Sequence, residues 1–425
     1  MWGTVKKIWH AKDLRSKIVF VFLIMILFRI TAHIPIPGVN AGALAQLFSQ
    51  NQLLGFVNIF SGGALENFSI VMLGVGPFIT ASIIFQILQL VIPKLDQMAK
   101  EDGEAGQRKI NQYTRIATIP LAALQGFATI NLLQSASGGA ILPGNMSVLD
   151  WVIAITIVTT GSVFLMWLGE LITEKQIGNG VSLIIFAGIV SSLPSSLQSV
   201  FISFDSSQIP SLLGFAFIGF VTIAGVVYVT EGQRNIPISH ARHHSAQGQQ
   251  SHLPIRVNQA GVIPIIFAVA LVLAPSLVAQ ITVKSAMPWL VNFSQGVINA
   301  FENQLIYGIA YFLLVFIFSY FYTGVIFHPD RIAENLQRGG SFIPGIRPGQ
   351  DTEDYLRRVS NRIVLTGALF LGIIAVLPLI LQAFAAGNLQ NLAIGGTSLL
   401  IVVSVAIETV KQIEAQLLLR DYEKF

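Results

Sequence analysis

Long apolar runs alternate with polar connections along almost the whole chain. Ten of these runs are long enough to cross a hydrocarbon core of about 30 Å as a helix. They cover approximately residues 18–36, 68–92, 116–134, 148–172, 181–202, 209–230, 260–281, 305–327, 363–386 and 397–417. The pattern therefore predicts an all-α integral membrane protein with ten transmembrane helices.

Basic residues fall on alternate connections between these runs. Of the 25 lysines and arginines, Arg29 lies inside a run and Lys284 lies on the cation-poor side, and the rest lie on the opposite side. Because cytoplasmic connections of membrane proteins are enriched in lysine and arginine, both termini are predicted to be cytoplasmic. A basic face also favours contact with anionic phospholipids and with acidic or nucleic-acid partners.

Composition supports a single membrane domain. The chain is 53% hydrophobic and 11% charged, which leaves too few polar groups to cover a soluble protein of this length. It has no cysteine, so disulfides and thiolate metal or redox chemistry are excluded. The first run is followed by Pro35-Ile-Pro-Gly38 instead of a small-residue cleavage site, which indicates a retained helix.

The ten runs divide into two sets of five, residues 1–205 and 206–425. Gly74-Val-Gly-Pro77 in the second run is similar to Gly261-Val-Ile-Pro264 in the seventh. Those runs cross in opposite directions, so a repeat that relates them must be inverted. A simple kink in each helix is the alternative explanation of the Gly-x-x-Pro pattern.

Catalytic and metal-binding patterns are absent. The runs contain almost no ionisable residue; Arg29 can snorkel or pair with backbone carbonyls, and Glu408 lies near Lys411. No hydrolase or phosphate-binding motif occurs, so the chain is not predicted to be an enzyme. The histidines of one basic connection could bind zinc or could simply be hydrated, and the latter is favoured because no carboxylate or thiolate is close: His240, His243, His244 and His252. No cofactor and no metal are therefore expected.

Uncharged polar residues remain as candidates. Thr80 and Gln86 lie in the second run, Gln125 in the third, and Asn258 at the start of the seventh. Such groups hold membrane helices together, and a reversible contact of this kind is also a latch.

Two connections carry further signals. The glycine-rich segment 58–68 is either an external loop or a segment folded back into the membrane. Among the long basic connections, 231–259 and 328–362, the second holds Arg347 between two Pro-Gly pairs, which form stiff turns. This arginine belongs either to a solvated surface arm or to a docking element.

Several separated strings together resemble the SecY family of protein translocases, and they follow the family's order along nearly the whole chain. They are Phe28-Arg-Ile30, Ile34-Pro-Ile-Pro-Gly38, Phe60-Ser-Gly-Gly-Ala-Leu65, the ten residues Gly106 to Arg115, the eight residues Trp167 to Glu174, Ile177-Gly-Asn-Gly180, the seven residues His252 to Asn258, Gly261-Val-Ile-Pro264, the eight residues Phe342 to Gly349, and the seven residues Gly395 to Ile401.

The resemblance implies a gated protein-conducting channel in which two pseudo-symmetric halves open like a clam shell. A plug would occupy 60–73, and its first residues would be Phe60, Ser61, Gly62, Gly63, Ala64, Leu65 and Glu66. An aliphatic pore ring would consist of Val75, Ile79, Val181, Ile185, Ile266 and Ile401. The polar latch of a lateral gate would consist of Thr80, Gln86, Gln125 and Asn258. Val75, Ile79 and Ile83 recur every four residues, which gives one aliphatic stripe.

The resemblance also implies partners. Subunits SecE and SecG, the SecA motor, the translating ribosome with its rRNA, signal peptides and unfolded preproteins are expected, in the inner membrane of a bacterium. Docking would use Arg347, Arg234, Arg242 and Arg256. The 231–259 connection is shorter than in the family and lacks its arginine pair, so the preferred partner, motor or ribosome, stays open. An inverted-repeat transporter of a small solute is the alternative function, and the scarcity of buried ionisable groups argues against it.

Overall fold

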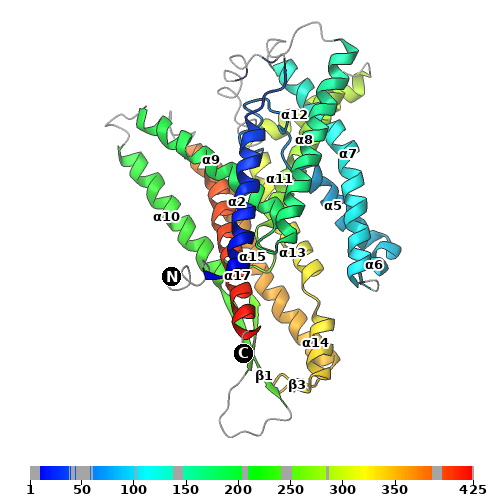
Figure 1. Cartoon of the computed structure of the whole chain (residues 1–425), viewed down its shortest axis with the longest axis vertical. Helices are drawn as coiled ribbons and strands as arrows, with labels where there is room; N and C mark the ends of the chain where they lie inside the picture. The colour runs from blue at the N-terminus through cyan, green and yellow to red at the C-terminus, as the bar shows by residue number, and fades with distance from the viewer. Residues whose placement is uncertain are drawn as a thin grey trace. The chain divides into compact units, whose positions relative to one another are not determined.

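The structure is a computed structural model that describes residues 10–37, 39, 44, 58, 61–100, 103–136, 147–202, 209–240, 251–283, 287–384 and 395–423. These residues form helices and one small sheet (Figure 1). The helices are α2 (Lys12–Ala32), α5 (Gly76–Val91), α6 (Pro93–Lys100), α7 (Gly103–Ala136), α8 (Val148–Glu174), α9 (Gly180–Ile202), α10 (Ile209–Glu231), α11 (Ile263–Thr282), α12 (Pro288–Glu302), α13 (Gln304–Ile326), α14 (Pro329–Arg338), α15 (Gln350–Phe384) and α17 (Gly395–Glu423). The strands are β1 (Gln233–His240), β2 (Ser251–Arg256) and β3 (Ser341–Phe342).

Each expected membrane-spanning run falls on a helix. Within the described part of the chain, four helical stretches are long and apolar enough to cross a membrane: Ala105–Gln134, Val148–Glu174, Gln304–Arg338 and Gln350–Leu377. Shorter apolar helices cover Gly76–Gln89, Gly180–Pro194, Ala216–Glu231 and Ile263–Val272. The largely helical membrane architecture agrees with the sequence, whereas the count of ten spans stays a prediction.

Several helix bounds differ from the apolar runs. The second run was expected from residue 68, but α5 begins at Gly76 because residues 61–75 form turns instead of helix. Phe68 and Gly74 have positive φ angles of 44° and 59°, which a helix does not accept. Helices α7 and α15 begin well before their apolar runs, so their polar first turns extend beyond any membrane-spanning part.

The chain divides into two compact units. The first contains Met1–Ile209, Val269–Tyr307 and Val405–Phe425, and the second contains Pro210–Ala268 and Gly308–Ser404. The division of the sequence into two inverted halves of five helices concerns topology and stays a prediction.

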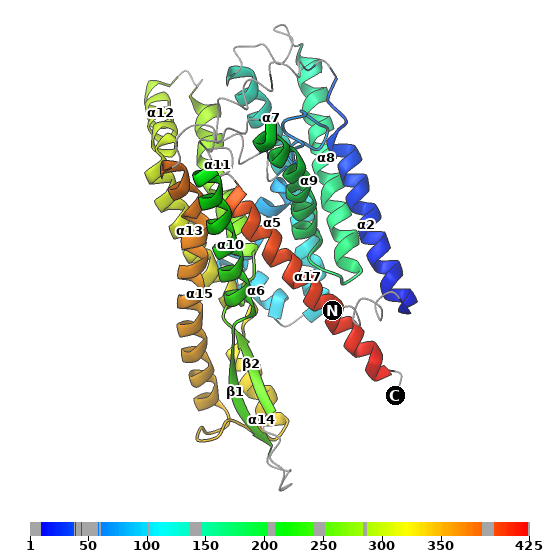
Figure 2. The same ribbon diagram turned by 90° about the vertical axis from the view of Figure 1, so that its left-hand side faces the viewer.

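In the first unit, helices that follow one another along the chain pack as neighbours. Helix α7 packs against α5 and α8, α8 packs against α9, and α2 contacts both α8 and α9 (Figure 2). Phe127 of α7 and Trp151 of α8 have ring centroids 5.5 Å apart, which reinforces the α7–α8 contact. The long charged tail of α17 packs on the start of α2 through Leu417 and Leu14.

In the second unit, the segment that follows α10 forms a hairpin of β1 and β2, and β3 adds to its other edge in the order β2-β1-β3. Figure 2 shows β1 and β2 as a two-stranded ribbon that continues from α10. A cluster of buried apolar side chains joins the hairpin to α15 and to the turn before it: Ile236, Ile255, Ile343, Leu356 and Val359. This sheet, with α14 and the turn at residues 343–349 that leads to α15, forms what we call the sheet module. The all-α expectation missed it.

Candidate functional site

The plug expected from the resemblance falls on a segment of turns in the first unit, residues 61–73, which we call the turn segment; Phe60 lies outside the described residues. The second half of the turn segment pairs with the residues after α2. The amide of Ile36 donates to the carbonyl of Phe68 at 3.0 Å, and the amide of Ile70 donates to that of Ile34 at 3.1 Å. These bonds form an antiparallel bridge between Pro35 and Ser69. The segment is therefore attached to the residues after α2 through backbone groups at this end.

The first half of the turn segment is closed by its own side chains and by Asn58, which precedes it. The Asn58 amide accepts a bond from the Glu66 backbone and donates to the Glu66 carboxylate, both at 3.0 Å. The buried Ser61 hydroxyl donates to the Asn58 carbonyl at 2.9 Å and accepts from the Leu65 amide at 3.1 Å. These bonds within the segment fix the shape of the turn.

The turn segment packs on a cluster of buried apolar side chains, which we call the apolar bed. Leu65, Phe68 and Met72 are buried together with side chains from the residues after α2, from α7 and from α8: Ile36, Leu44, Ile130, Leu133, Ala154 and Val158. Gly161 of α8 makes room for the backbone, because a Cβ there would lie 1.9 Å from the carbonyl oxygen of Ile70. Apolar packing therefore stabilises the position of the segment in addition to its backbone bonds to residues 34 and 36.

The expected aliphatic ring residues are buried with one exception. In the first unit, Val75, Ile79 and Ile185 are buried and Val181 is partly buried; in the second, Ile266 and Ile401 are buried. Val75 precedes α5, while Ile79 and the buried Ile83 lie one and two turns into it, which confirms the aliphatic stripe. Their common function as a ring stays a proposal.

A rigid turn between α8 and α9 positions Val181. Gly180 approaches α8 so closely that a Cβ on it would lie 1.8 Å from the carbonyl oxygen of Gly169. Its amide donates to the hydroxyl of Thr173 at 2.9 Å, and Gln176 adopts a positive φ of 59°. The carbonyl of Gln176 accepts a 2.5 Å bond from the Gln416 amide of α17. The start of α9 is therefore held by contacts on two sides.

The expected gate residues form local contacts within each unit. The Gln125 amide of α7 donates to the Thr80 hydroxyl of α5 at 3.2 Å, so the structure brings these two together. Gln86 donates to Ser82 at 3.4 Å, and its buried carbonyl oxygen has no hydrogen-bond partner within the described part of the chain. In the second unit, buried Asn258 donates to the carbonyl of Gly261 at 3.2 Å.

Three of the four expected docking arginines lie on the sheet module. Arg234 of β1, Arg256 of β2 and Arg347 are exposed, and Arg242 lies outside the described residues. Arg347 sits in a turn that contains Gly345 and Gly349 at φ angles of 81° and 101°. The sequence indicated the stiff turns but not the sheet that carries them.

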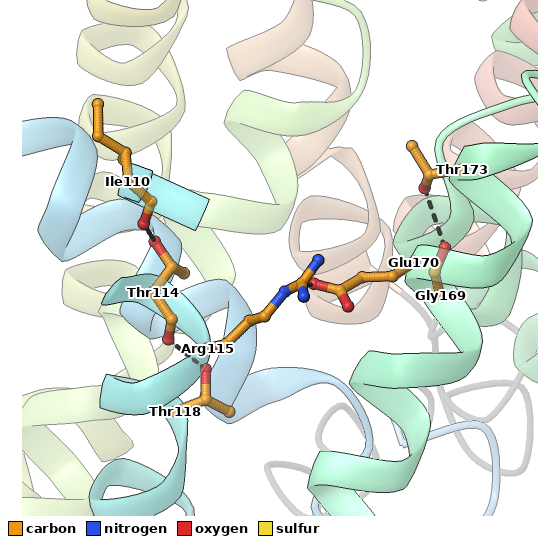
Figure 3. A network of polar contacts seen from close by, with 7 residues as sticks. All are labelled: Ile110, Thr114, Arg115, Thr118, Gly169, Glu170 and Thr173. Carbon is orange, nitrogen blue, oxygen red and sulfur yellow. Dashed lines mark hydrogen bonds and ion pairs between the residues drawn. The ribbon is translucent and has the colours of Figure 1, made fainter. Parts of the chain in front are cut away.

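An ion pair joins α7 to α8 (Figure 3). The Arg115 guanidinium lies 2.5 Å from the Glu170 carboxylate, with side-chain exposures of 49% and 20%. One turn along α8, the Thr173 hydroxyl donates to the Gly169 carbonyl at 2.9 Å. The sequence gives no sign of this pair, because no local pattern relates two residues on separate helices.

We find no candidate metal site among the residues that the structure describes. They contain no group of three histidine, aspartate or glutamate side chains that could hold an ion. Two of the four histidines singled out, His243 and His244, lie outside the described residues. The assembled features are thus a turn segment packed on apolar side chains, buried aliphatic residues and exposed arginines.

Comparison with known sequences gives matches over nearly the full length. A family model described as SecY matches residues 69–410. The protein translocase subunit SecY of Mycobacterium bovis is 43% identical, with 97% of each chain covered. That of Halalkalibacterium halodurans is 42% identical, with 100% of each covered.

Solved structures share the fold. One described as a protein-conducting channel matches with a TM-score of 0.64 and 19% identity, and covers 94% of this chain and 91% of that one. A SecY structure described by the role of its plug domain in the closed channel gives 0.63 and 20%, with the same coverage. Sec61 in a canine ribosome–channel complex gives 0.62 and 18%, again with 94% and 91% covered.

Proposed function

This chain belongs to the SecY family, and from that premise we propose that it is the channel-forming subunit of a protein translocase. In this function it passes unfolded secretory polypeptides across a membrane and releases transmembrane segments sideways into lipid. The single observation that carries the proposal is the turn segment at 61–73, which is folded on an apolar bed next to the buried stripe of Val75 and Ile79.

The turn segment acts as the plug in this proposal. Its first half is shaped by Asn58, Ser61 and Glu66 and can move as a preformed piece, while its second half stays tied to residues 34–36. In the same proposal, a ring formed by Val75, Ile79, Val181, Ile185, Ile266 and Ile401 dewets and blocks ions. Aliphatic side chains offer no hydrogen bond by which one passing sequence is preferred to another.

Lateral release uses the polar residues Thr80, Gln86, Gln125 and Asn258 as a gate latch. A passing segment leaves for lipid when its side chains are sufficiently apolar, because apolar residues are more stable in the bilayer than in water. The bond between Gln125 and Thr80 supports this proposal, as does the buried Gln86 carbonyl oxygen, which has no hydrogen-bond partner among the described residues. Ten spans in two inverted halves, 1–205 and 206–425, complete the proposed architecture.

Partners dock on the sheet module. Arg347, Arg234, Arg256 and Arg242 present guanidinium groups that bind carboxylates and phosphates alike, so SecA and ribosomal RNA both fit. Signal peptides and unfolded preproteins are the passengers, SecE and SecG the accompanying subunits, and anionic phospholipids face the basic connections. The chain then resides in a bacterial inner membrane with both termini in the cytoplasm.

Other function classes are less well supported. Membership in a family of translocase subunits confirms the expectation that the chain is not an enzyme. The relatives with full-length matches are translocase subunits, which leaves the solute-transporter alternative without an observation in its favour.

Reconstitution tests the proposal. Proteoliposomes that contain the chain with SecE and SecG should protect a secretory precursor from external protease when SecA and ATP are supplied, and not when ATP is omitted. Uptake of labelled amino acids or sugars should stay at the level of empty liposomes. Solute accumulation without precursor protection would replace this proposal with the transporter.

A further inference from the structure

A cationic side chain of α2 reaches the turn segment. The Arg29 guanidinium donates a 2.6 Å hydrogen bond to the backbone carbonyl of Gly62. Arg29 lies one turn before the end of the helix, inside the apolar run where a charge is costly and is retained mainly for function. The sequence left this residue with a choice between snorkelling and carbonyl contact, and the contact is what the structure contains.

Gly62 is also packed tightly against α9. A Cβ on Gly62 would lie 2.8 Å from the Cα of Gly188 and 2.8 Å from the ring of Phe28. Conversely, a Cβ on Gly188 would lie 2.4 Å from the Cα of Gly62. Gly62 has a φ of 70°, which L side chains rarely adopt. Both positions therefore require glycine for the tip of the turn, residues 61–66, to sit against α9.

The two ends of the turn segment are held by different kinds of contact. The end at 68–70 is held by two backbone bonds to residues 34 and 36. Glu66, the acidic residue of the tip, bonds to Asn58. Among the described residues, the charge-assisted bond from a helix to the tip is the one from Arg29. One bond of this kind can break without disturbing the bridge at the other end.

We propose that Arg29 is the latch that holds the 61–66 tip against Gly188, while the Pro35–Ser69 bridge is the hinge about which the tip leaves. Arg29 is thus a positioning residue for the plug, and the inference rests on the proposed channel function. When a passenger enters, the Gly62 carbonyl loses its donor and the tip swings while the residues near Ser69 stay paired.

Two readouts test the latch in the complex with SecE and SecG. The first is ion conductance of the resting channel in a planar bilayer. The second is labelling of a single cysteine by a water-soluble maleimide in the variant Ala64→Cys, which is specific because the chain has no other cysteine and Ala64 is fully buried.

Arg29→Met should raise both conductance and labelling about tenfold or more, since losing a hydrogen bond to a charged group shifts a two-state balance by that order. Arg29→Lys, which keeps the charge, should restore part of the wild-type behaviour. Lys12→Met removes an exposed cation from the same helix and should leave both readouts unchanged. Equal conductance and labelling in wild type and Arg29→Met would overturn the latch.

Gly188→Ala provides a second variant in case Arg29→Met does not fold. Its added methyl group pushes the tip away while Arg29 remains, so conductance and labelling should again rise. Wild-type values would show that the tip does not pack against Gly188. Precursor translocation by the wild-type complex separates the two ideas. If the wild type fails to translocate, the channel function is wrong, whereas translocation with unchanged variants removes only the latch.

Discussion

The hydroxyl of Thr352 donates a 2.8 Å hydrogen bond to the backbone carbonyl of Arg347. Thr352 lies in the first turn of α15 and is 2% exposed, while the Arg347 side chain is exposed. A buried hydroxyl thus fixes the backbone from which an exposed guanidinium projects. The contact also crosses the turn that contains Gly349, so it limits how far that turn can move.

Thr352→Val should lower the rate of SecA-driven translocation while it leaves the protein folded. The valine keeps the shape of the side chain but removes the donor to the Arg347 carbonyl. Reversing the docking charge in Arg347→Glu should lower the rate of precursor protection, and Thr352→Val should lower the same rate several-fold. Thr352→Ser should retain most of the activity. A net hydrogen bond is worth about 1 kcal/mol, which is enough to loosen the turn without unfolding the module. Initial rates at several SecA concentrations measure the effect.

The matched control is Thr366→Val on the same helix, where an exposed hydroxyl faces the Arg362 carbonyl at 3.4 Å. It should translocate like the wild type. If Thr352→Val did so as well, the bond to Arg347 would have no part in docking.

The ion pair between Arg115 and Glu170 should contribute little to stability. Both groups are partly exposed, and solvent screens such pairs, so a double-mutant cycle with Arg115→Gln and Glu170→Gln should give a coupling of about 0.2–1 kcal/mol that shrinks in high salt. Thermal unfolding of the purified complex in detergent measures it. The pair of Arg357 and Glu353 lies within one helix, α15, and its coupling free energy serves as the reference. A coupling several times larger, insensitive to salt, would contradict this view of the contact.

Gly180→Ala should be among the most disruptive single-methyl changes in the chain. The new Cβ would lie 1.8 Å from the Gly169 carbonyl oxygen, so the turn before Val181 has to shift, at a cost of at least about 2 kcal/mol. Gly219→Ala on α10, where nothing lies within 4 Å, should be neutral or slightly stabilising. Melting temperatures from fluorescence-detected size exclusion compare them, and equal temperatures would contradict the close approach.

The apolar runs predicted the main helices because burial in lipid leaves an unambiguous compositional signal. The stripe of Val75, Ile79 and Ile83 followed from the same periodicity. The sequence could not reveal that the helix starts only at Gly76, because the preceding residues are just as apolar. Their backbone groups bond to residues 34 and 36, and such partners far along the chain leave no local pattern.

The hairpin was missed although it carries a weak signal. Ile236 and Ile238 are buried and alternate with exposed residues, as strands require. Pro237 and Pro254 weaken that signal, because proline has no backbone N–H to donate to a neighbouring strand. Among the described residues, β3 pairs with Ser239 and His240 of β1 and does not reach Pro237, and Pro254 lies on the outer strand β2. Both prolines are therefore tolerated in the hairpin.

The contact between the turn segment and α9 could not be predicted from the sequence either. From the sequence, Arg29 was expected either to snorkel or to pair with backbone carbonyls, and the segment that contains Gly62 and Gly63 was recognised as glycine-rich. Nothing in the sequence related Gly62 to Gly188, because a missing side chain becomes informative only when the facing backbone is known.

The most direct test of the central claim is site-specific photo-crosslinking of a precursor arrested halfway through the membrane. A photoreactive residue at Ile79, Ile185 or Ile401 should crosslink to the arrested polypeptide, because these buried positions form the proposed ring. The same group at Phe217, which is 68% exposed on α10, should crosslink to lipid. Crosslinks to the polypeptide at Phe217 with none at the three ring positions would contradict passage through the aliphatic ring.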